Sequence, residues 1–436
     1  SQGFFEGVRI IFIENQIFSE KNAVYVYTEE EAKLNPTFEC GIGHKDSFQM
    51  NVIFQQAVLY YGFLTNNEPK IIHCQDAATA LVSVFARNLF PFVRFYATTK
   101  FIVTIHNAGP GYLHTFPTME IAKNITNLPE NILKRGVPYY NCQVVEPFLL
   151  AAKYSYITTV SPWYAQELFD TNNQFCLLAR DFLESGIKIV GITNGIDYEN
   201  YDPTDKSVSC LCHTYNPLVG DFEGKFKIRS DFFNMINSSK GEIKIGGNKF
   251  QCLGSVSQIN DDTVVFVYQG RLVSQKGVEI FSDAASRMLD EKRNVCFILH
   301  GQGQTYLENY QTELAERYKG RYCYIKGYDR KIARDVVSCA DFLVLPSIFE
   351  PCCLEDFIAQ IYGTIPIANA VGGLNKIKNN ETGFLYTENS SQNLHIALVR
   401  AMGILQNEKE KITEMRITAA KTVKNSYSWS SIIDEK

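Results

Sequence analysis

The sequence predicts an α/β protein with two doubly wound parallel sheets. Short apolar runs of strand length alternate with amphipathic stretches of helix length, which is the pattern of successive βαβ units. The alternation occurs twice, with a polar stretch between the two series. Polar residues and glycines follow most of the apolar runs, and the carboxyl ends of parallel strands would place them along one edge of each sheet.

The first series predicts a domain over residues 1–203. Several of its apolar runs are hydrophobic on both faces, as strands buried in a parallel sheet are. We expect strands at residues 7–15, 70–75, 100–107, 156–161 and 187–195. We expect helices at residues 46–64, 76–90 and 161–170.

The second series predicts a domain over residues 204–418. Its strands are expected at residues 263–270, 294–301, 321–327, 341–347 and 365–370. Its helices are expected at residues 277–292, 305–318 and 330–340. Residues 204–260 are polar and rich in Ser, Gly, Asn and Lys, so we expect them to form the connection between the domains or an insertion on the second.

The composition argues against several classes of protein. The net charge is −5 and the basic residues are scattered, whereas a nucleic-acid partner requires a basic face. No apolar run has the length of a membrane span, and the first residues lack the features of a signal peptide. We therefore expect a cytoplasmic protein without a membrane partner, whose 12 cysteines are reduced thiols.

Two cations follow the first strand of the second series. Arg271 and Lys276 lie in one loop, "YQGRLVSQKG", between that strand and the next helix. Two cations near the start of a helix suit a diphosphate. Taken alone they would be solvated surface residues, but their place at the carboxyl end of a buried strand favours the diphosphate.

The stretch "LPSIFEPCCLEDFIAQ" supplies further polar groups at the same edge. Pro351 suits the first turn of a helix, which would leave backbone N–H groups free to hold a phosphate, namely those of Cys353, Leu354 and Glu355. The acids Glu355 and Asp356 favour the helix but compete with an anion. Glu350 can accept hydrogen bonds from sugar hydroxyls, and the alternative is a helix-capping carboxylate.

Other strand ends carry candidate ligand groups. His106 ends a buried strand, where it is either a satisfied core residue or a group that reaches a ligand. Asp76 is either the N-cap of the following helix or a ligand group. Gly372 and Gly373 form either a tight turn or a place where the backbone touches a ligand.

The stretch "SCLCH" raises the question of a metal site. Cys210, Cys212 and His213 are candidate ligands at one-residue spacing, and no second half follows nearby. Structural zinc sites are almost always four-coordinate. We therefore predict no metal ion here.

Together these stretches resemble the bacterial glycogen synthase and starch synthase family, which are retaining, ADP-glucose-dependent glycosyltransferases of the two-Rossmann (GT-B) type. Landmarks occur in the family's order over nearly the whole chain: "IIHCQDAATAL", "FIVTIHNAGPGYLHTF", "ITTVSPWYAQEL", "GITNGIDYENYDP", "YQGRLVSQKG", "PSIFEPCCL", "YGTIPIANAVGGL", "ETGFL" and "YSWSSI". The resemblance implies two Rossmann-like domains that face a cleft. It also implies that the tail, residues 419–436, is a helix that returns to the N-terminal domain.

The resemblance implies transfer of glucose from ADP-glucose to the non-reducing end of an α-1,4-glucan, with retention of configuration and without a cofactor or metal ion. The catalytic set that it implies is His106, Asp76, Glu350, Arg271 and Lys276. Arg271 and Lys276 would offset the charge of the departing ADP. The implied nucleotide contacts also include Tyr328 with adenine and the amides of Cys352, Cys353, Leu354 and Glu355 with the distal phosphate. The implied sugar contacts are His106, Asn107, Asn194, Glu350, Gly372 and Gly373.

The chain also departs from the family pattern. The family opens with a strand and a Lys-x-Gly-Gly-Leu loop, and this chain has no such loop. We therefore expect an incomplete N-terminal domain with exposed apolar edges, in a fragment of a synthase that is weakly active alone. The alternatives are a catalytically impaired glucan-binding relative and a retaining GT-B transferase that uses another nucleotide sugar.

Overall fold

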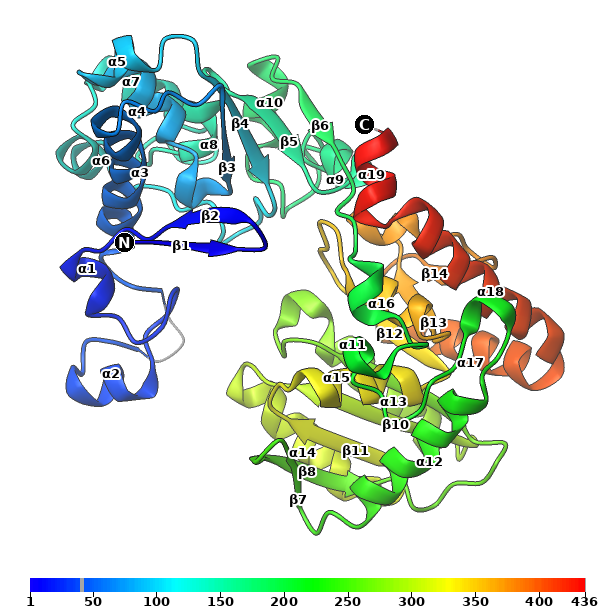
Figure 1. The fold of residues 1–436 in the computed structure, drawn as a ribbon. Helices are drawn as coiled ribbons and strands as arrows, with labels where there is room; N and C mark the ends of the chain where they lie inside the picture. Colours follow the sequence, from blue (N-terminus) through cyan, green and yellow to red (C-terminus); the bar gives the residue numbers. More distant parts are fainter. Residues whose placement is uncertain (40–42, 436) are drawn as a thin grey trace. The chain divides into compact units, whose positions relative to one another are not determined.

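The computed structural model describes residues 1–39 and 43–435, and the chain forms two compact units (Figure 1). The first unit consists of Ser1–Val160 and Ala165–Gly191, and the second of Ser161–Tyr164 and Ile192–Lys436. The chain thus passes into the second unit at residue 192, somewhat before the expected boundary at 203. Within the described part of the chain, we find no helix that is both long enough and apolar enough to cross a membrane.

The first unit is built around a parallel sheet with the strand order β3-β4-β5-β6. The strands are β3 (Ile71–Gln75), β4 (Lys100–Ile105), β5 (Tyr156–Thr159) and β6 (Ile189–Gly191). The helices along this part of the chain are α3 (Ser47–Leu64), α4 (Val82–Asn88), α5 (Phe92–Phe95), α6 (Met119–Thr126), α7 (Glu130–Leu133), α8 (Pro147–Ala152), α9 (Pro162–Glu167) and α10 (Ala179–Glu184). Four of the predicted strands are therefore present, in a parallel arrangement.

The strand predicted at residues 7–15 does not join this sheet, and that prediction is wrong. Instead β2 (Val8–Ile11) pairs antiparallel with β1 (Gln2–Phe5) in a separate hairpin. The two residues of its turn, Glu6 and Gly7, both have positive φ, which is the geometry of a two-residue hairpin turn. Two short helices follow, α1 (Gln16–Ser19) and α2 (Glu29–Leu34).

β3 is one of the two edge strands of the first sheet, as the structure describes it. Among the described residues it has a strand partner on one side only, and Ile71 at its start is 56% exposed. An apolar edge of this kind is what the sequence predicts for the first sheet.

The second unit contains a mixed sheet, whose order among the described strands is β14-β13-β12-β9-β10-β11-β8-β7. Its parallel strands are β9 (Val264–Gln269), β10 (Val295–Gly301), β11 (Tyr322–Lys326), β12 (Phe342–Leu345), β13 (Ile365–Asn369) and β14 (Phe384–Tyr386). The strands β9 to β13 match the predicted ones. They are buried throughout apart from the last residue of β11, as their continuous apolar runs require.

Residues 204–260 are more regular than their composition suggests. They contain α11 (Lys206–Ser209), α12 (Glu223–Asn237) and an antiparallel hairpin of β7 (Glu242–Ile245) and β8 (Asn248–Ser255). The hairpin turn is Gly246-Gly247, with positive φ at both residues. Because β8 pairs antiparallel with β11, this segment extends the second sheet.

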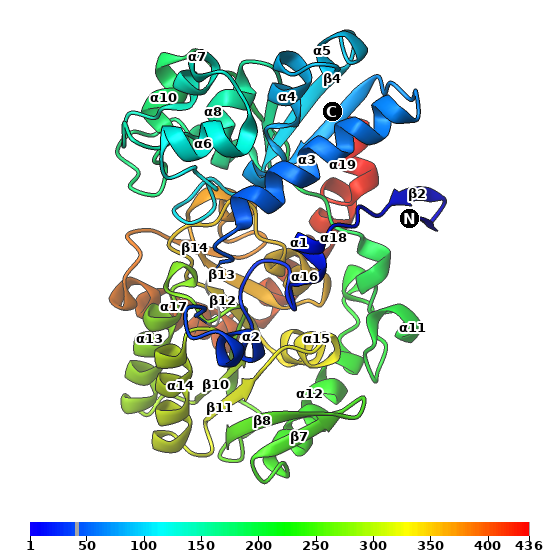
Figure 2. The ribbon, with the colours of Figure 1, turned by 90° about the vertical axis from the view of Figure 1, so that its left-hand side faces the viewer.

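Helices cover both faces of the second sheet (Figure 2). One face carries α13 (Val278–Asp290), α14 (Thr305–Arg317) and α17 (Ser391–Asn407), and the other carries α12, α15 (Arg330–Cys339) and α16 (Glu355–Ile361). Strand residues alternate between the two layers: Val264 and Phe266 pack in the first, and Val265 and Val267 in the second. This is the doubly wound arrangement that the sequence predicts.

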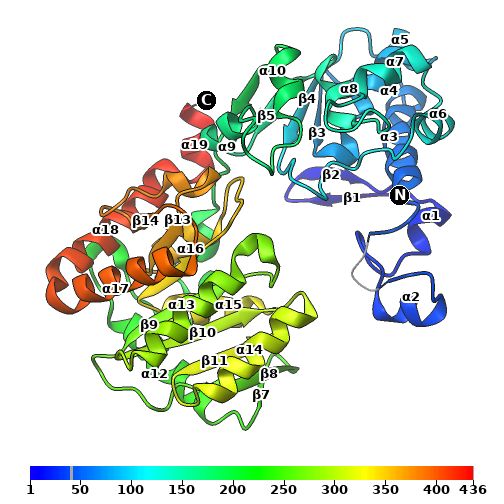
Figure 3. The same ribbon diagram turned by 180° about the vertical axis from the view of Figure 1, so that it is seen from behind.

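The C-terminal segment is helical (Figure 3). It consists of α18 (Lys409–Ser426), which packs against α17, and α19 (Trp429–Glu435). One continuous helix thus crosses the expected domain boundary at residue 418. The return of the tail to the N-terminal domain stays a prediction.

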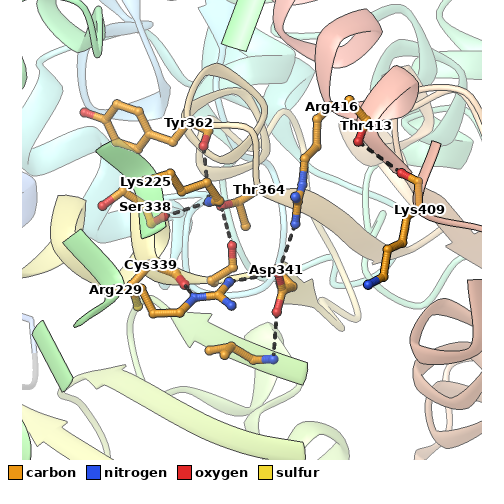
Figure 4. Close-up of polar contacts among 12 residues, drawn as sticks. Lys225, Arg229, Ser338, Cys339, Asp341, Tyr362, Thr364, Lys409, Thr413 and Arg416 are labelled. Atoms are coloured by element: carbon orange, nitrogen blue, oxygen red, sulfur yellow. Dashed lines mark hydrogen bonds and ion pairs between the residues drawn. The ribbon is translucent and has the colours of Figure 1, made fainter. Parts of the chain in front are cut away.

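A buried ion-pair network ties α12 and α18 to the sheet (Figure 4). Asp341, directly before β12, accepts hydrogen bonds on one oxygen from Arg229 at 2.8 Å and from Arg416 at 2.9 Å. Its other oxygen accepts the backbone N–H of Val265 at 3.0 Å. Since Arg229 lies on α12 and Arg416 on α18, one carboxylate joins two helices that are distant in sequence.

Candidate functional site

A cavity of about 320 Å³ lies at the carboxyl ends of β9, β10, β11 and β12 in the second unit. Its walls contain many of the residues that the sequence singles out: Arg271, Lys276, Tyr328, Glu350, Cys353 and Glu355. The other lining residues are Tyr268, Gln269, Gly270, His300, Gly301, Gln302, Gly327, Leu345, Pro346 and Ser347. The cavity thus lies beyond the carboxyl ends of parallel strands, where ligands of such sheets usually bind.

The loop with Arg271 and Lys276 runs from the end of β9 to the start of α13. Gly277 ends it with a φ of +66°, and a Cβ atom there would lie 1.9 Å from the Pro346 carbonyl oxygen. Only glycine fits this contact without a backbone shift. The loop is thereby held against the segment that leads to Glu350.

Lys276 and Glu350 form the central ion pair of the cavity. Their Nζ and Oε2 atoms are 2.6 Å apart, and the same oxygen accepts the hydroxyl of Ser347 at 3.1 Å. Burial by itself would lower the pKa of Lys276, but the negative charge of Glu350 outweighs that effect and raises it. Lys276 is therefore a permanent cation at the wall of the cavity, and Glu350 is a carboxylate held in one position.

The segment after Glu350 differs from the sequence expectation. We expected a helix with Pro351 in its first turn, but α16 begins at Glu355, and that prediction is wrong. The reason is Cys353, whose φ of +64° is left-handed and interrupts any helical path. Cys353 and Glu355 line the cavity, whereas Cys352 is buried beside it and Leu354 is 42% exposed.

The glycine pair supports this segment from behind. Gly373 donates its backbone N–H to the Glu350 carbonyl at 2.8 Å, and a Cβ atom there would lie 2.3 Å from the Cα of Cys352. Neither Gly372 nor Gly373 is among the residues that line the cavity. Gly373 therefore packs against the backbone of Glu350 and Cys352, and the expected sugar contacts of the two glycines stay a prediction.

Lys376 is a functional candidate that the sequence reasoning missed. It is buried, pairs with Asp356 at 2.9 Å, and donates to the carbonyl oxygens of Cys352 and Cys353 at 2.5 and 3.0 Å. The negative charge of Asp356, which we expected to compete with an anion, is thus neutralised inside the protein. The sequence feature that could have indicated this residue is its position three residues after the Gly372-Gly373 pair.

His300 is a second residue that the sequence reasoning missed, because it lies inside an apolar strand. It is buried at the end of β10, and burial lowers the pKa of its imidazole to about 4, so the ring is neutral. Neither ring nitrogen has a hydrogen-bond partner among the described residues. The Tyr328 ring lies nearly parallel to this ring, with 6.3 Å between the ring centres, and the Tyr328 residue is 69% exposed.

Ser161 and Asn194 hold the same segment from another side within the second unit. The Ser161 hydroxyl donates to the Pro351 carbonyl at 2.7 Å. Burial raises the pKa of the Cys352 thiol, and a hydrogen bond from the Asn194 backbone partly lowers it again. Asn194, expected as a sugar contact, thus meets Cys352 through its main chain.

Glu355 is expected to make ligand binding at this cavity depend on pH. Burial raises the pKa of its carboxyl group to about 7, although the hydrogen bond from Gln269 at 2.9 Å lowers it somewhat. The protonated form carries no charge, so it repels an anionic ligand less than the carboxylate does. We expect the affinity for ADP to fall as the pH rises from 6 to 8, and this part of the pH dependence to be absent in Glu355→Gln. Calorimetric titration with ADP at several pH values measures both. An identical pH profile in the variant would contradict the assignment.

In the first unit, Asp76, His106 and Asn107 come together at the carboxyl ends of β3 and β4. Asp76 has a φ of +60°, and its carboxylate accepts the backbone N–H groups of His106 at 2.7 Å and Asn107 at 3.2 Å. It makes no side-chain cap, so the N-cap alternative is wrong. The His106 ring bonds the side chain of Gln75 at 2.7 Å. The positive φ of Asp76 is compensated by these two hydrogen bonds, and its role in ligand binding stays a prediction.

Two family models match the chain. The starch synthase catalytic domain matches residues 1–179, and the glycosyl transferases group 1 model matches residues 263–403. The first match spans β3, β4 and β5 of the first sheet, and the second spans β9 to β14 of the second sheet. The second also contains Arg271, Lys276 and Glu350.

Relatives of known name are similar to this chain over nearly its whole length. The chain is 30% identical over 426 residues to the glycogen synthase of Thermodesulfovibrio yellowstonii, covering 97% of this chain and 76% of that one. It is 26% identical over 455 residues to the glycogen synthase of Lactobacillus acidophilus, with 98% and 81% covered.

The catalytic domain of starch synthase IV from Arabidopsis thaliana, solved with ADP and acarbose, superposes with a TM-score of 0.79 at 25% identity, covering 100% of this chain and 82% of that one. Sucrose-phosphate synthase from Thermosynechococcus elongatus, at 17% identity and a TM-score of 0.55 over 91% and 78% of the two chains, shares the fold. The chain therefore belongs to the glycogen synthase family of glycosyltransferases, as its sequence motifs predict.

Proposed function

We propose that this protein transfers glucose from ADP-glucose to the non-reducing end of an α-1,4-glucan, with retention of configuration. The observation that carries the proposal is the single cavity in which Arg271, Lys276 and Glu350 meet at the carboxyl ends of the strands. The ADP and acarbose bound to the related plant enzyme support a nucleotide sugar and a glucan as the two substrates.

The donor contacts follow from the cavity. Arg271 and Lys276 would hold the diphosphate, and their charges would offset the negative charge that grows on ADP as it leaves. Glu350, fixed by Lys276 and Ser347, would accept hydrogen bonds from the glucose hydroxyls. The exposed ring of Tyr328 would stack on adenine.

The acceptor contacts would come from the first unit. There the Asp76 carboxylate holds the backbone of His106 and Asn107, so that these side chains present fixed polar groups to a sugar. In the reaction the bond from the glucose C1 to the phosphate oxygen breaks, and a bond from C1 to the acceptor O4 forms. The proton of that hydroxyl passes to the departing phosphate, so ADP is the second product.

A donor competition assay tests the proposal. The protein is incubated with maltooligosaccharides and either ADP-glucose or UDP-glucose, and chain extension is followed by chromatography. We expect extension to be faster with ADP-glucose, and the new linkage to show the α-anomeric proton by NMR. Faster extension with another nucleotide sugar would favour the related transferase. Calorimetric binding of maltooligosaccharide without binding of ADP would favour a glucan-binding relative.

A further inference from the structure

On the surface of the second unit, a thiol, an imidazole and a carboxylate lie together outside the donor cavity. The Nε2 atom of His213 is 2.7 Å from an oxygen of Asp231, and the sulfur of Cys212 is 3.9 Å from the same oxygen. All three donor atoms lie within 4.8 Å of one another. We propose that Cys212, His213 and Asp231 bind one divalent transition-metal ion, and that Zn²⁺ fits this donor set best.

The local fold presents these side chains together. Leu211 and Tyr215 are buried in the core beneath α12, so the residues between them are held on the outside of the unit. Asp231 lies on the following helix, α12. That helix starts in contact with the same loop, because a Cβ atom on Gly224 would be 2.1 Å from the Thr214 carbonyl oxygen.

The loop is also fixed further upstream. Arg334 on α15 donates to the carbonyl oxygens of Asn200, at 2.7 Å, and Val208. Asp205 caps α11 by accepting the Ser207 N–H at 2.8 Å. A metal ion would thus find its ligands already ordered, and the binding energy would not be spent on ordering a mobile loop.

The geometry and the charge suit a tetrahedral ion. Zn²⁺ lies about 2.3 Å from a thiolate and about 2.0–2.2 Å from imidazole nitrogen or carboxylate oxygen, so neighbouring donor atoms are about 3.3–3.6 Å apart. The observed separations bracket this value, and the ion would replace the proton now shared by His213 and Asp231. One thiolate and one carboxylate balance a charge of +2, and the thiolate disfavours Mg²⁺ and Ca²⁺.

The three protein ligands leave the fourth position of a tetrahedral ion to water.

The sequence alone argued against this site because it offered only Cys210, Cys212 and His213. In the structure Cys210 adopts a left-handed conformation at the end of α11 and does not join the cluster. Asp231 provides the third donor from a separate helix. The interpretation of "SCLCH" thus changes because the fold adds a ligand that sequence spacing could not show.

Metal titration tests the proposal. The reduced protein is stripped with a chelator and titrated with Zn²⁺ in competition with a chromophoric indicator. We expect one ion per chain at this site, and at least a tenfold weaker affinity in Cys212→Ser and in Asp231→Asn. Cys142→Ser is the matched control, because Cys142 is an exposed thiol outside the cluster, and it should leave the affinity unchanged.

Two further measurements separate this site from chance binding. Co²⁺ should give a thiolate charge-transfer band that disappears in Cys212→Ser, and Zn²⁺ should raise the midpoint of thermal unfolding of the native chain but not of His213→Gln. Equal Zn²⁺ affinity in the native chain, Cys212→Ser and His213→Gln would overturn the proposal. If either Cys212→Ser or His213→Gln failed to fold, the Zn²⁺ affinity of the other variant would still test the proposal.

Discussion

Replacing Lys276 with alanine is expected to lower kcat/KM for ADP-glucose by about 10²–10³-fold, since removal of one charge-stabilising donor has effects of that size. The ammonium group lies in the cavity wall, 2.6 Å from Glu350. The diphosphate carries negative charge in the bound donor and gains more as the bond to glucose breaks. A cation there therefore stabilises the transition state more than the bound donor, and most of the loss should appear in kcat.

The control for this experiment is Lys378→Ala. Lys378 belongs to the same unit, but its pair with Glu381 is exposed, and we expect a change of no more than a few-fold. Arg271→Ala, at an exposed position of the same cavity, should show a loss comparable to that of Lys276→Ala. Since Lys276→Ala leaves Glu350 buried without its cation, thermal unfolding must show that the variant is folded at the assay temperature. An unchanged kcat in a folded Lys276→Ala would refute the assigned role.

Replacing Asp341 with asparagine is expected to lower the free energy of unfolding by about 3–5 kcal/mol, because it leaves the buried guanidinium group of Arg416 and the largely buried one of Arg229 without a counter-charge. Burial would raise the pKa of Asp341, but Arg229 and Arg416 outweigh that effect and lower it. The stabilisation is therefore fully present above the pKa of the unfolded chain, about 3.9, and is lost as the pH falls through the lower pKa of the folded state.

Asp290→Asn is the matched control for the Asp341 variant. Asp290 pairs with Arg317 at 3.0 Å, but both side chains are more than half exposed, and such pairs contribute about 1 kcal/mol or less. Denaturant unfolding followed by fluorescence compares the two variants with the native chain. Similar midpoints for the two variants would show that the Asp341 network contributes no more than a surface pair.

The sequence predicted the core of the fold because burial leaves a strong pattern. The strands β9 to β13 are apolar on both faces, which only a central parallel strand requires. The pattern failed for the two hairpins, whose strands are mostly exposed or half-buried. The strand β2 has apolar residues like those of a core strand. The polar strands β7 and β8 form one end of the second sheet, where β7 is the edge strand and β8 lies between β7 and β11.

The site was predictable where chemistry follows a strand, as at Arg271 and Glu350. It was not predictable where the backbone takes an unusual path, as at Cys353, since local propensity gives no sign of a left-handed residue there. His300 was not predictable because it lies in an apolar run, whereas the Gly-Gly pair before Lys376 was a signal that this lysine could be important. The pairing of Lys276 with Glu350 joins residues 74 positions apart, which only the fold brings together.

The contact of Gly277 with Pro346 has a mechanical consequence. Ile348 donates its N–H to the Gln275 carbonyl at 2.9 Å, and the Gln275 side chain donates to the Phe349 carbonyl at 3.1 Å. These two hydrogen bonds and the glycine contact join the two loops at several points. We therefore expect the loop with Arg271 and Lys276 to move together with the segment that leads to Glu350. The two loops should behave as one rigid element. We expect their amide hydrogens to exchange at similar rates, and both loops to become more protected from exchange when ADP binds.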